Sequence, residues 1–353
     1  MKIDGKPYRS IWLNDNGWSV HIFDQRSLPW KLDIAELKTP QDAAIAIKEM
    51  WTRGAPLLAM TGAYGLALAL REDPSDENLK ANYDMLLATR PTAVNLRWAL
   101  DEMMKAVKPL QAEERIKAAY ARAKEMCDED VETNKSIGEY GLPLIREAHA
   151  KNPDRPVNIL THCNAGWLAT VDYGTATSPI YRAHDEGIDV HVWVDETRPR
   201  NQGALLTAYE LQQHGVPHTV ISDNAGGLLM QQGQVDMVIV GTDRVTRNGD
   251  VCNKIGTYLK ALAAHDNNVP FYVALPMTTF DESLESGSLI PIEERSGDEV
   301  IYVEGETGRM KITNSAAANP AFDITPARLV TGYITEDGIK TLPLYQSSKV
   351  VGL

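Results

Sequence analysis

The ten residues VNILTHCNAG, at positions 157–166, join a short β-branched and apolar run to a polar segment that ends in glycine. The run Val157–Thr161 is typical of a buried strand, and the polar segment is typical of the loop that follows one. Similar runs follow at 189–194, 219–222, 237–240 and 271–275. Helical patterns lie between them at 205–214 and 255–265. Alternating strands and helices predict an α/β domain built on a doubly wound parallel sheet.

The residues before this domain show a different pattern. Ile11–Leu13 and Val20–Phe23 are β-rich runs separated by the turn signal NDNG at 14–17. Thr39 and Pro40 mark a helix start, and helical patterns follow at 56–70, 93–107 and 112–127. The sequence therefore predicts two domains: 1–130, a β-meander with helices, and 131–353, the α/β domain, with the boundary between Asp128 and Asp154.

Composition and charge exclude several classes of protein. The net charge of -13 argues against binding to nucleic acid. The longest apolar run, Ala55–Leu70, is broken by Thr61 and two glycines, which argues against a membrane span. Three cysteines form no zinc-binding spacing, and the N-terminus lacks the apolar core of a signal peptide. These features predict a cytoplasmic protein without a metal site.

Ligands of open parallel sheets bind beyond the carboxyl ends of the strands, so the residues at those ends are the first candidates for a site. Cys163 follows the first strand, where helix-dipole amides would lower the pKa of a thiol and favour a base or nucleophile. The alternative is a small buried hydrophobe, which is also expected for Cys127. Asp243 follows the strand at 237–240, where burial would raise its pKa and suit a general acid. The alternative is a helix N-cap.

An acidic protein that binds a phosphate must supply local positive charge. Arg53-Gly54-Ala55-Pro56 precedes an apolar helix, so a guanidinium and free backbone amides would meet there. Arg90 precedes the next helix, and Asn253 with Lys254 is expected to open another. Each of these residues is otherwise a solvated surface group. No dinucleotide-binding GxGxxG or P-loop motif is present.

Several of these segments together resemble the methylthioribose-1-phosphate isomerases, within the superfamily of the initiation factor 2B α, β and δ subunits. The resemblance covers nearly the whole chain, in order. It rests on the segments DQRSLP (24–29), RGAP (53–56), RPTAVNL (90–96), THCNAG (161–166), DETRP (195–199), QGA (202–204), GTDR (241–244), NKIGT (253–257) and NPAFD (319–323).

The resemblance implies a fold, an activity and a set of site residues. The fold is a Rossmann-like C-terminal domain preceded by a smaller domain, usually in a homodimer. The activity is the conversion of 5-methylthioribose 1-phosphate to 5-methylthioribulose 1-phosphate in methionine salvage, without metal or organic cofactor. Cys163 and Asp243 match the catalytic positions. The substrate-binding positions are matched by Arg53, Gly54, Ala55, Arg90, Gln202, Asn253 and Lys254.

One residue departs from the family pattern. Trp167 stands where many members carry a small residue, and a large aromatic beside the catalytic loop is expected to reshape the pocket around the substituent at C5 of the sugar. The substituent is therefore methylthio, 5-deoxy or another small group. Two alternative functions are a ribose-1,5-bisphosphate isomerase, which needs a second phosphate site, and a non-catalytic regulatory subunit that binds sugar phosphates or nucleotides.

Overall fold

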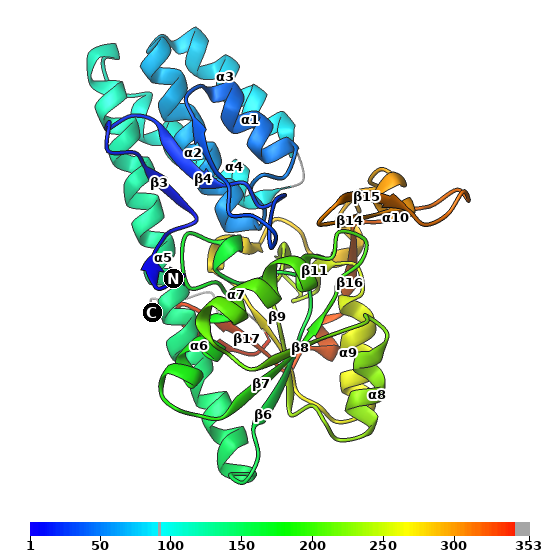
Figure 1. Ribbon diagram of the computed structural model, residues 1–353. Coiled ribbons are helices and arrows are strands. Elements are labelled where there is room, and N and C mark those ends of the chain that lie inside the picture. Colours follow the sequence, from blue (N-terminus) through cyan, green and yellow to red (C-terminus); the bar gives the residue numbers. More distant parts are fainter. Residues whose placement is uncertain (91–92, 343–353) are drawn as a thin grey trace, which may run out of the picture.

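The computed structural model describes residues 1–90 and 93–342. Helices and short strands from the first third of the chain lie at one end of the molecule, and the large sheet lies at the other (Figure 1). The long helix α5 (Ala112–Lys151) runs beside both. Pro91 and Thr92 of the RPTAVNL segment lie outside the described residues.

The large sheet has seven strands in the order β18-β17-β12-β9-β6-β7-β8. Its strands are β6 (Val157–Thr161), β7 (Val190–Asp195), β8 (His218–Ile221), β9 (Met237–Val240), β12 (Phe271–Ala274), β17 (Gly332–Thr335) and β18 (Gly338–Lys340). All neighbours pair in parallel except β17 and β18. From β6 the chain continues to β7 on one side and later returns to β9 on the other. The predicted doubly wound sheet is thus confirmed, and its topological switch point lies between β6 and β9.

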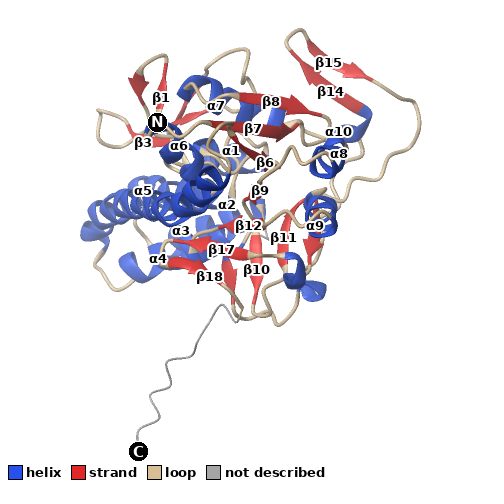
Figure 2. Cartoon of the chain, turned by 90° about the horizontal axis from the view of Figure 1, so that it is seen from below, coloured by secondary structure: helices blue, strands red, loops and turns tan. Residues whose placement is uncertain are grey.

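Both faces of this sheet are covered, as the continuous apolar runs predict. Ile159 and Ile239 pack on one face with α6 (Ser178–Asp185) and the second half of α5, whereas Leu160 and Val240 pack on the other with α9 (Thr257–Asp266). Figure 2 shows the sheet with helices on its two sides. The remaining helices of this part are α7 (Ala208–His214), α8 (Ala225–Gln231) and α10 (Asp298–Ile301).

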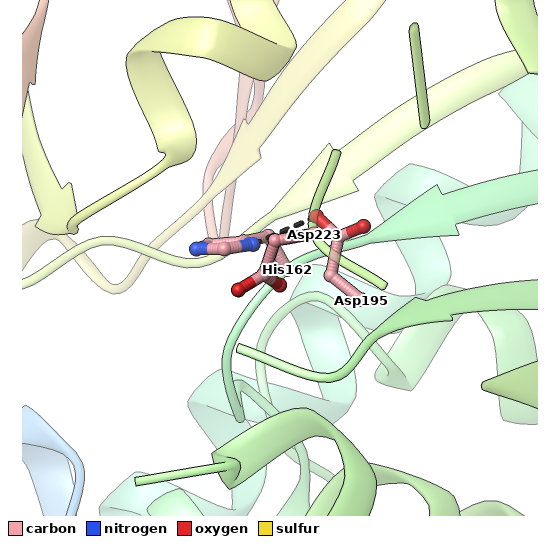
Figure 3. Close-up of side chains that lie close together, drawn as sticks. All are labelled: His162, Asp195 and Asp223. Atoms are coloured by element: carbon pink, nitrogen blue, oxygen red, sulfur yellow. Dashed lines mark hydrogen bonds and ion pairs between the residues drawn. The ribbon is translucent and has the colours of Figure 1, made fainter. Parts of the chain in front are cut away.

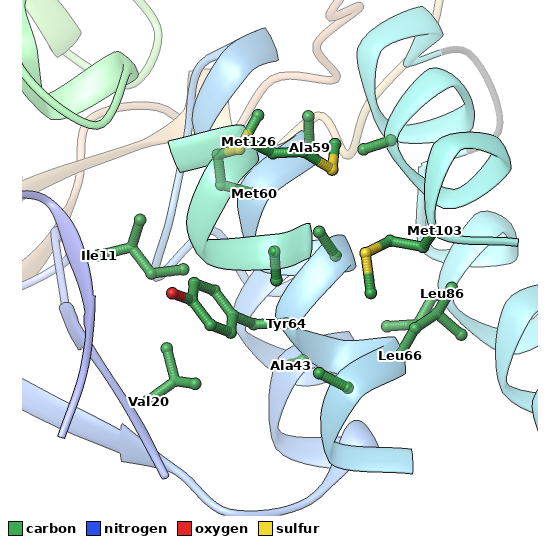
Figure 4. Packing of buried hydrophobic residues seen from close by; sticks show 14 of the residues in the cluster. Ile11, Val20, Ala43, Ala59, Met60, Tyr64, Leu66, Leu86, Met103 and Met126 are labelled. Carbon is green, nitrogen blue, oxygen red and sulfur yellow. The ribbon is translucent and has the colours of Figure 1, made fainter. Parts of the chain in front are cut away.

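The N-terminal part packs around one central helix. It contains β1 (Lys2–Ile3), β2 (Lys6–Pro7), β3 (Ile11–Leu13), β4 (Val20–Phe23), β5 (Ile34–Leu37), α1 (Pro40–Lys48), α2 (Ala55–Glu72), α3 (Asp76–Thr89) and α4 (Val94–Val107). The predicted start of α1 is confirmed, because Thr39 and Asp42 form a capping box. Every residue of α2 from Ala55 to Leu70 is buried, and Figure 4 shows Tyr64 of this helix packed beside Ile11 and Val20.

The apolar character of α2 therefore reflects a helix enclosed on all sides. Among the described residues, no helix combines the length and the apolar character that crossing a membrane requires.

Helix α5 is much longer than the pattern at 112–127 predicts. Its first half, with Ala119 and Met126, belongs to the hydrophobic cluster around α2, and its second half, with Ile137 and Ile145, belongs to the cluster beneath the large sheet. The predicted division at residues 130 and 131 falls inside this helix, where one cluster gives way to the other. It stays a prediction, but no flexible linker marks it.

A second, smaller sheet has the order β13-β10-β11-β16. Its strands are β10 (Arg244–Thr246), β11 (Val251–Lys254), β13 (Phe280–Asp281) and β16 (Phe322–Thr325), and β14 (Tyr302–Gly305) with β15 (Gly308–Lys311) forms a separate hairpin. The prediction that Asn253 and Lys254 open a helix is wrong. Both lie on β11, paired with Asp323 and Phe322 of β16, a distant partner that local sequence cannot reveal. Helix α9 begins three residues later, at Thr257.

Candidate active site

A cavity lies at the carboxyl ends of β6 and β9, at the switch point of the large sheet. Every site residue predicted from the sequence lines it: Arg53, Gly54, Ala55, Arg90, Cys163, Gln202, Asp243, Asn253 and Lys254. These residues come from the N-terminal part, from loops of the large sheet and from the small sheet. The cavity therefore forms only when all three are packed together.

Cys163 is held in an unfavourable backbone conformation by its neighbours. Its φ is +66°, in the left-handed region that non-glycine residues rarely adopt. Its backbone N–H donates to Thr197 Oγ1 at 2.9 Å, and its carbonyl accepts a hydrogen bond from Thr207 Oγ1 at 2.7 Å. Thr207 ends a short π-helical segment, Gly203–Thr207, of the kind often found at functional sites. Such a strained residue, held from both sides, is typical of a functional position.

The expectation of a lowered thiol pKa at Cys163 is wrong. Burial raises the pKa of Cys163 to about 11, and the nearby ammonium of Lys254 and guanidinium of Arg53 only partly oppose it. Cys163 lies in a loop before a 3-10 turn, Trp167–Ala169, and not at the start of an α-helix. The expectation for Cys127 is confirmed, since its side chain lies in the core around α2.

Asp243 fits the prediction of a buried acid. Burial raises its pKa, against the opposing effect of Lys254 and Arg90. The helix N-cap alternative is excluded, because β10 and not a helix follows directly at Arg244. The backbone N–H of Asp243 donates to the carbonyl of Cys252 at 3.0 Å, which ties the residue to β11.

The other end of the cavity is suited to an anion. Gly54 is the N-cap of α2 without any side-chain hydrogen bond to the helix, so the positive pole of α2 faces the cavity. Gly54 has φ +89°, and a Cβ there would lie 2.4 Å from the carbonyl oxygen of Ala169. Arg53 and Arg90 each have a buried Nε with no partner. Burial and the nearby Arg200 lower the pKa of Arg53 to about 9.

Several lining residues escaped the sequence analysis. Arg200 and Arg295 add two guanidinium groups to the cavity wall, each paired with Glu299, at 2.9 and 2.7 Å. Arg200 stands two residues before Gln202, close enough to a quoted segment to have been considered. Arg295 lies in an irregular segment between η4 (Gly287–Leu289) and α10, where no local signal marks it. His162, Asn164 and Thr175 also line the cavity.

The expectation that Trp167 reshapes the pocket is wrong. Its side chain is fully buried and packs edge-on against Phe23, with ring centroids 6.0 Å apart, in the core beneath the large sheet. It is not among the residues that line the cavity. The backbone bends after Gly166, so the loop faces the cavity while the indole points away from it. Trp167 therefore gives no argument about the C5 substituent or a second phosphate.

His162, Asp195 and Asp223 lie close together beside the cavity in an arrangement that superficially suits a metal ion (Figure 3). The charged groups around these three residues do not fit a metal ion. The ammonium of Lys260 lies 3.2 Å from Asp195 Oδ2 and donates a hydrogen bond to the carbonyl of Asp223. The carboxylate of Asp223 accepts from the backbone N–H groups of Thr197 and Arg198. A lysine thus already supplies the positive charge of this cluster.

Comparison with known proteins agrees with this fold and site. The sequence model of the Initiation factor 2 subunit family matches residues 51–341. The chain therefore belongs to the Initiation factor 2 subunit family.

Individual relatives identify a narrower group within this family. The chain is 62% identical over 350 residues to the methylthioribose-1-phosphate isomerase of Rhizobium meliloti (97% of this chain and 96% of the relative). It is 64% identical over 348 residues to that of Acidiphilium cryptum (96% and 94%). Within the family, the chain thus belongs with the methylthioribose-1-phosphate isomerases.

Two solved structures share the whole fold. The 5-methylthioribose 1-phosphate isomerase of Pyrococcus horikoshii superposes with a TM-score of 0.83 at 39% identity, covering 96% of this chain and 94% of that one. A protein from A. fulgidus described as the delta subunit of translation initiation factor eIF-2B superposes with a TM-score of 0.80 at 41% identity (96% and 97%). The fold is therefore shared by a protein named as an isomerase and by one named as a translation initiation factor subunit.

Proposed function

We propose that this protein is an aldose–ketose isomerase that converts 5-methylthioribose 1-phosphate into 5-methylthioribulose 1-phosphate, a step of methionine salvage. The observation that carries the proposal is that Cys163 and Asp243 face one cavity whose wall contains five basic side chains: Arg53, Arg90, Arg200, Lys254 and Arg295. The names of relatives above 60% identity support the same reaction.

The phosphate decides what the enzyme has to do first. A sugar 1-phosphate has no free aldehyde, because its C1 is locked in a cyclic acetal. Asp243, whose pKa is raised by burial, is suited to hold a proton near neutral pH and donate it to the ring oxygen as the bond between C1 and that oxygen breaks. The buried guanidinium groups of Arg53 and Arg90 and the positive pole of α2 would hold the phosphate in place.

Two routes then lead to the ketose. In one, the thiolate of Cys163 takes the proton from C2, and the resulting enol phosphate is protonated at C1 while its C2 hydroxyl gives up a proton to form the ketone. In the other, a hydride moves from C2 to C1 and the C2 hydroxyl loses its proton, while Cys163 shapes a dry environment for the transfer. The raised pKa of Cys163 favours the second route, since a thiol with a pKa of about 11 is a poor base at neutral pH.

The oligomeric state and the cellular compartment belong to this proposal as well. A homodimer is supported by the resemblance to the family. A cytoplasmic location is supported by the acidic composition and the three unpaired cysteines.

The direct test is to incubate the purified protein separately with 5-methylthioribose 1-phosphate, 5-deoxyribose 1-phosphate and ribose 1,5-bisphosphate, and to follow the ketose phosphate by NMR. Fastest turnover of the methylthio substrate supports the proposal. Preference for the deoxy sugar or the bisphosphate reassigns the substrate. Binding without turnover of any of the three favours a regulatory role, the second candidate, which the 41% identity to a protein with an eIF-2B name supports.

A further inference from the structure

His162 connects two loops that carry different parts of the candidate active site. It precedes Cys163 on the loop after β6, and its side chain is fully buried at the cavity wall. One ring nitrogen, Nδ1, lies 2.8 Å from Asp195 Oδ2, and the other, Nε2, lies 2.8 Å from the carbonyl oxygen of Ile255. A backbone carbonyl only accepts hydrogen bonds, so Nε2 carries a proton and donates.

Ile255 directly follows Lys254, which lines the same cavity as Cys163 and Asp243 and interacts electrostatically with both. The bond from His162 Nε2 therefore fixes the chain at the point where β11 ends. The contact is tight, because a Cβ on Gly256 would lie 2.9 Å from His162 Cε1.

The other side of the ring is equally well held. Asp195 is fully buried at the end of β7, and Lys260 of α9 lies 3.2 Å from the same carboxylate oxygen that faces His162. The segment after Ile255 is held as well, because Asp323 of β16 accepts hydrogen bonds from the backbone N–H groups of Gly256 and Tyr258 at 2.7 and 3.1 Å. The charged groups around His162 are thus Asp195, Asp223, Asp323 and Lys260, and each is itself engaged.

We propose that His162 is a positioning residue, which holds Lys254 at its distance from Cys163 through the hydrogen bond to the Ile255 carbonyl. The role rests on the function proposed above, and it adds Lys254, one of the five basic side chains of the cavity wall, to the groups that hold the substrate phosphate. Lys254 also lowers the pKa of Cys163 more than any other neighbour does, against the larger effect of burial. Its placement therefore affects both the binding of phosphate and the ionisation of the Cys163 thiol.

Two substitutions separate the two bonds of the ring. The amide nitrogen of asparagine can reach the place of Nδ1, and that of glutamine the place of Nε2. His162→Asn therefore keeps a partner for Asp195 but loses the bond to Ile255, whereas His162→Gln keeps the bond to Ile255. If His162 were needed only for the stability of the core, His162→Asn would not weaken phosphate binding more than His162→Gln does.

The first readout, protection of Cys163 from alkylation, does not depend on turnover. Cys163 is partly exposed, while Cys127 and Cys252 are buried, so iodoacetamide at alkaline pH, where part of the Cys163 thiol is ionised, should alkylate Cys163 selectively, which peptide mass mapping checks. Inorganic phosphate bound between Arg53 and Lys254 should protect the thiol. His162→Asn is expected to need about tenfold more phosphate for half-protection, equivalent to ~1.4 kcal/mol, and to raise KM more than it lowers kcat. His162→Gln is expected to stay within about threefold of the wild type in half-protection.

His214 offers a matched control, because its Nε2 makes a 2.8 Å contact to Asp185 Oδ1 away from the cavity. His214→Asn should leave protection unchanged. Gly256→Ala would place a methyl group 2.9 Å from His162 Cε1 and would also strain the backbone at φ +103°, so it should weaken phosphate protection at least as much as His162→Asn, which keeps the test open if His162→Asn does not fold.

Equal protection of His162→Asn and His162→Gln would overturn the inference, as would a wild type that phosphate does not protect. A wild type that is protected but converts no sugar phosphate would instead contradict the proposed function, and the comparison of variants would still decide the role of His162.

Discussion

Cys163 and Thr197 are both held at positive φ, 66° and 64°, and are joined by a 2.9 Å hydrogen bond from the backbone N–H of Cys163 to Thr197 Oγ1. A β-branched residue in this conformation is strongly disfavoured, so the surrounding structure must hold it. The two strained residues belong to loops after adjacent strands, β6 and β7. The bond between them therefore fixes the candidate catalytic thiol against the neighbouring strand.

Replacing Thr197 by valine removes this acceptor while keeping the shape of the side chain. The N–H of Cys163 loses its partner, which should lower the stability by about 1–3 kcal/mol and kcat/KM by roughly tenfold. Thr197→Ser keeps the hydroxyl and should retain most activity. Chemical denaturation and steady-state kinetics measure both effects, and a fully active Thr197→Val would show that the bond is dispensable.

Cys163→Ser should lower turnover by about a hundredfold or more, because the more polar hydroxyl removes the base of the first route and disturbs the dry environment of the second. Cys127→Ser is the matched control, because Cys127 is buried in the core around α2 and should affect stability rather than turnover. NMR assays of both variants with 5-methylthioribose 1-phosphate make the comparison. Near-normal turnover of Cys163→Ser would contradict the assignment.

Asp243 should impose a pH dependence on the reaction. Its pKa is raised by burial, and the proposed role needs the protonated form, so kcat/KM should fall as the pH rises through that pKa. Asp243→Asn should lose about 10²–10⁴-fold in activity and this dependence with it. Asp337→Asn, at an exposed carboxylate, should leave the profile unchanged. An unaltered profile in Asp243→Asn would place the acid elsewhere.

Glu210 should be essential for stability although it lies outside the cavity. Its buried carboxylate accepts hydrogen bonds from Asn164 Nδ2 and from the backbone of Trp167 and Leu168, each at 2.9 Å. An amide nitrogen cannot accept, so Glu210→Gln should cost about 1–3 kcal/mol of unfolding free energy. Glu186→Gln, at an exposed ion pair, should cost under about 1 kcal/mol. If denaturant titrations give equal losses of unfolding free energy for Glu210→Gln and Glu186→Gln, this role of Glu210 is refuted.

Asp130 should make the protein less stable at higher pH. Burial raises its pKa to about 7, although the backbone N–H of Val171 donates to it. Because the folded-state pKa exceeds that of the unfolded chain, the stabilisation is complete at low pH and lost as the pH rises through about 7. The free energy of unfolding should fall by about 1 kcal/mol between pH 6 and pH 8, and this component should vanish in Asp130→Asn. If the free energy of unfolding changes with pH equally in the wild type and in Asp130→Asn, Asp130 is not the source of this pH dependence.

The parallel strands could be predicted because their signal is local. Met237–Val240 is apolar throughout, and Val157–Thr161 is interrupted only by Asn158 before its closing threonine, so both runs stand out in the sequence and match β9 and β6 residue for residue. The topology rule for such sheets then places Cys163 and Asp243 at one edge. Helix α3 was harder to predict, because its buried face includes Asn82 between Leu79 and Leu86, which weakens the apolar period.

The rest depends on contacts between residues far apart in the chain. Lys254 lies on a strand because β16, some seventy residues later, pairs with it. Arg295 reaches the cavity from an irregular segment, and the indole of Trp167 turns into the core to meet Phe23. The raised pKa of Cys163 follows from burial, which a strand-end position does not reveal.

Helix α5 limits how this molecule can move. Its forty residues form a rod of about 60 Å that is embedded in both hydrophobic clusters. Its internal proline, Pro143, lies within the part that packs beneath the sheet, so the stretch between Val131 and Ile137, where the clusters meet, is unbroken helix. Hinge opening between the two halves would require this rod to bend. We therefore expect substrate to enter and product to leave through movements of the surrounding loops, with little change in the distance between the two halves.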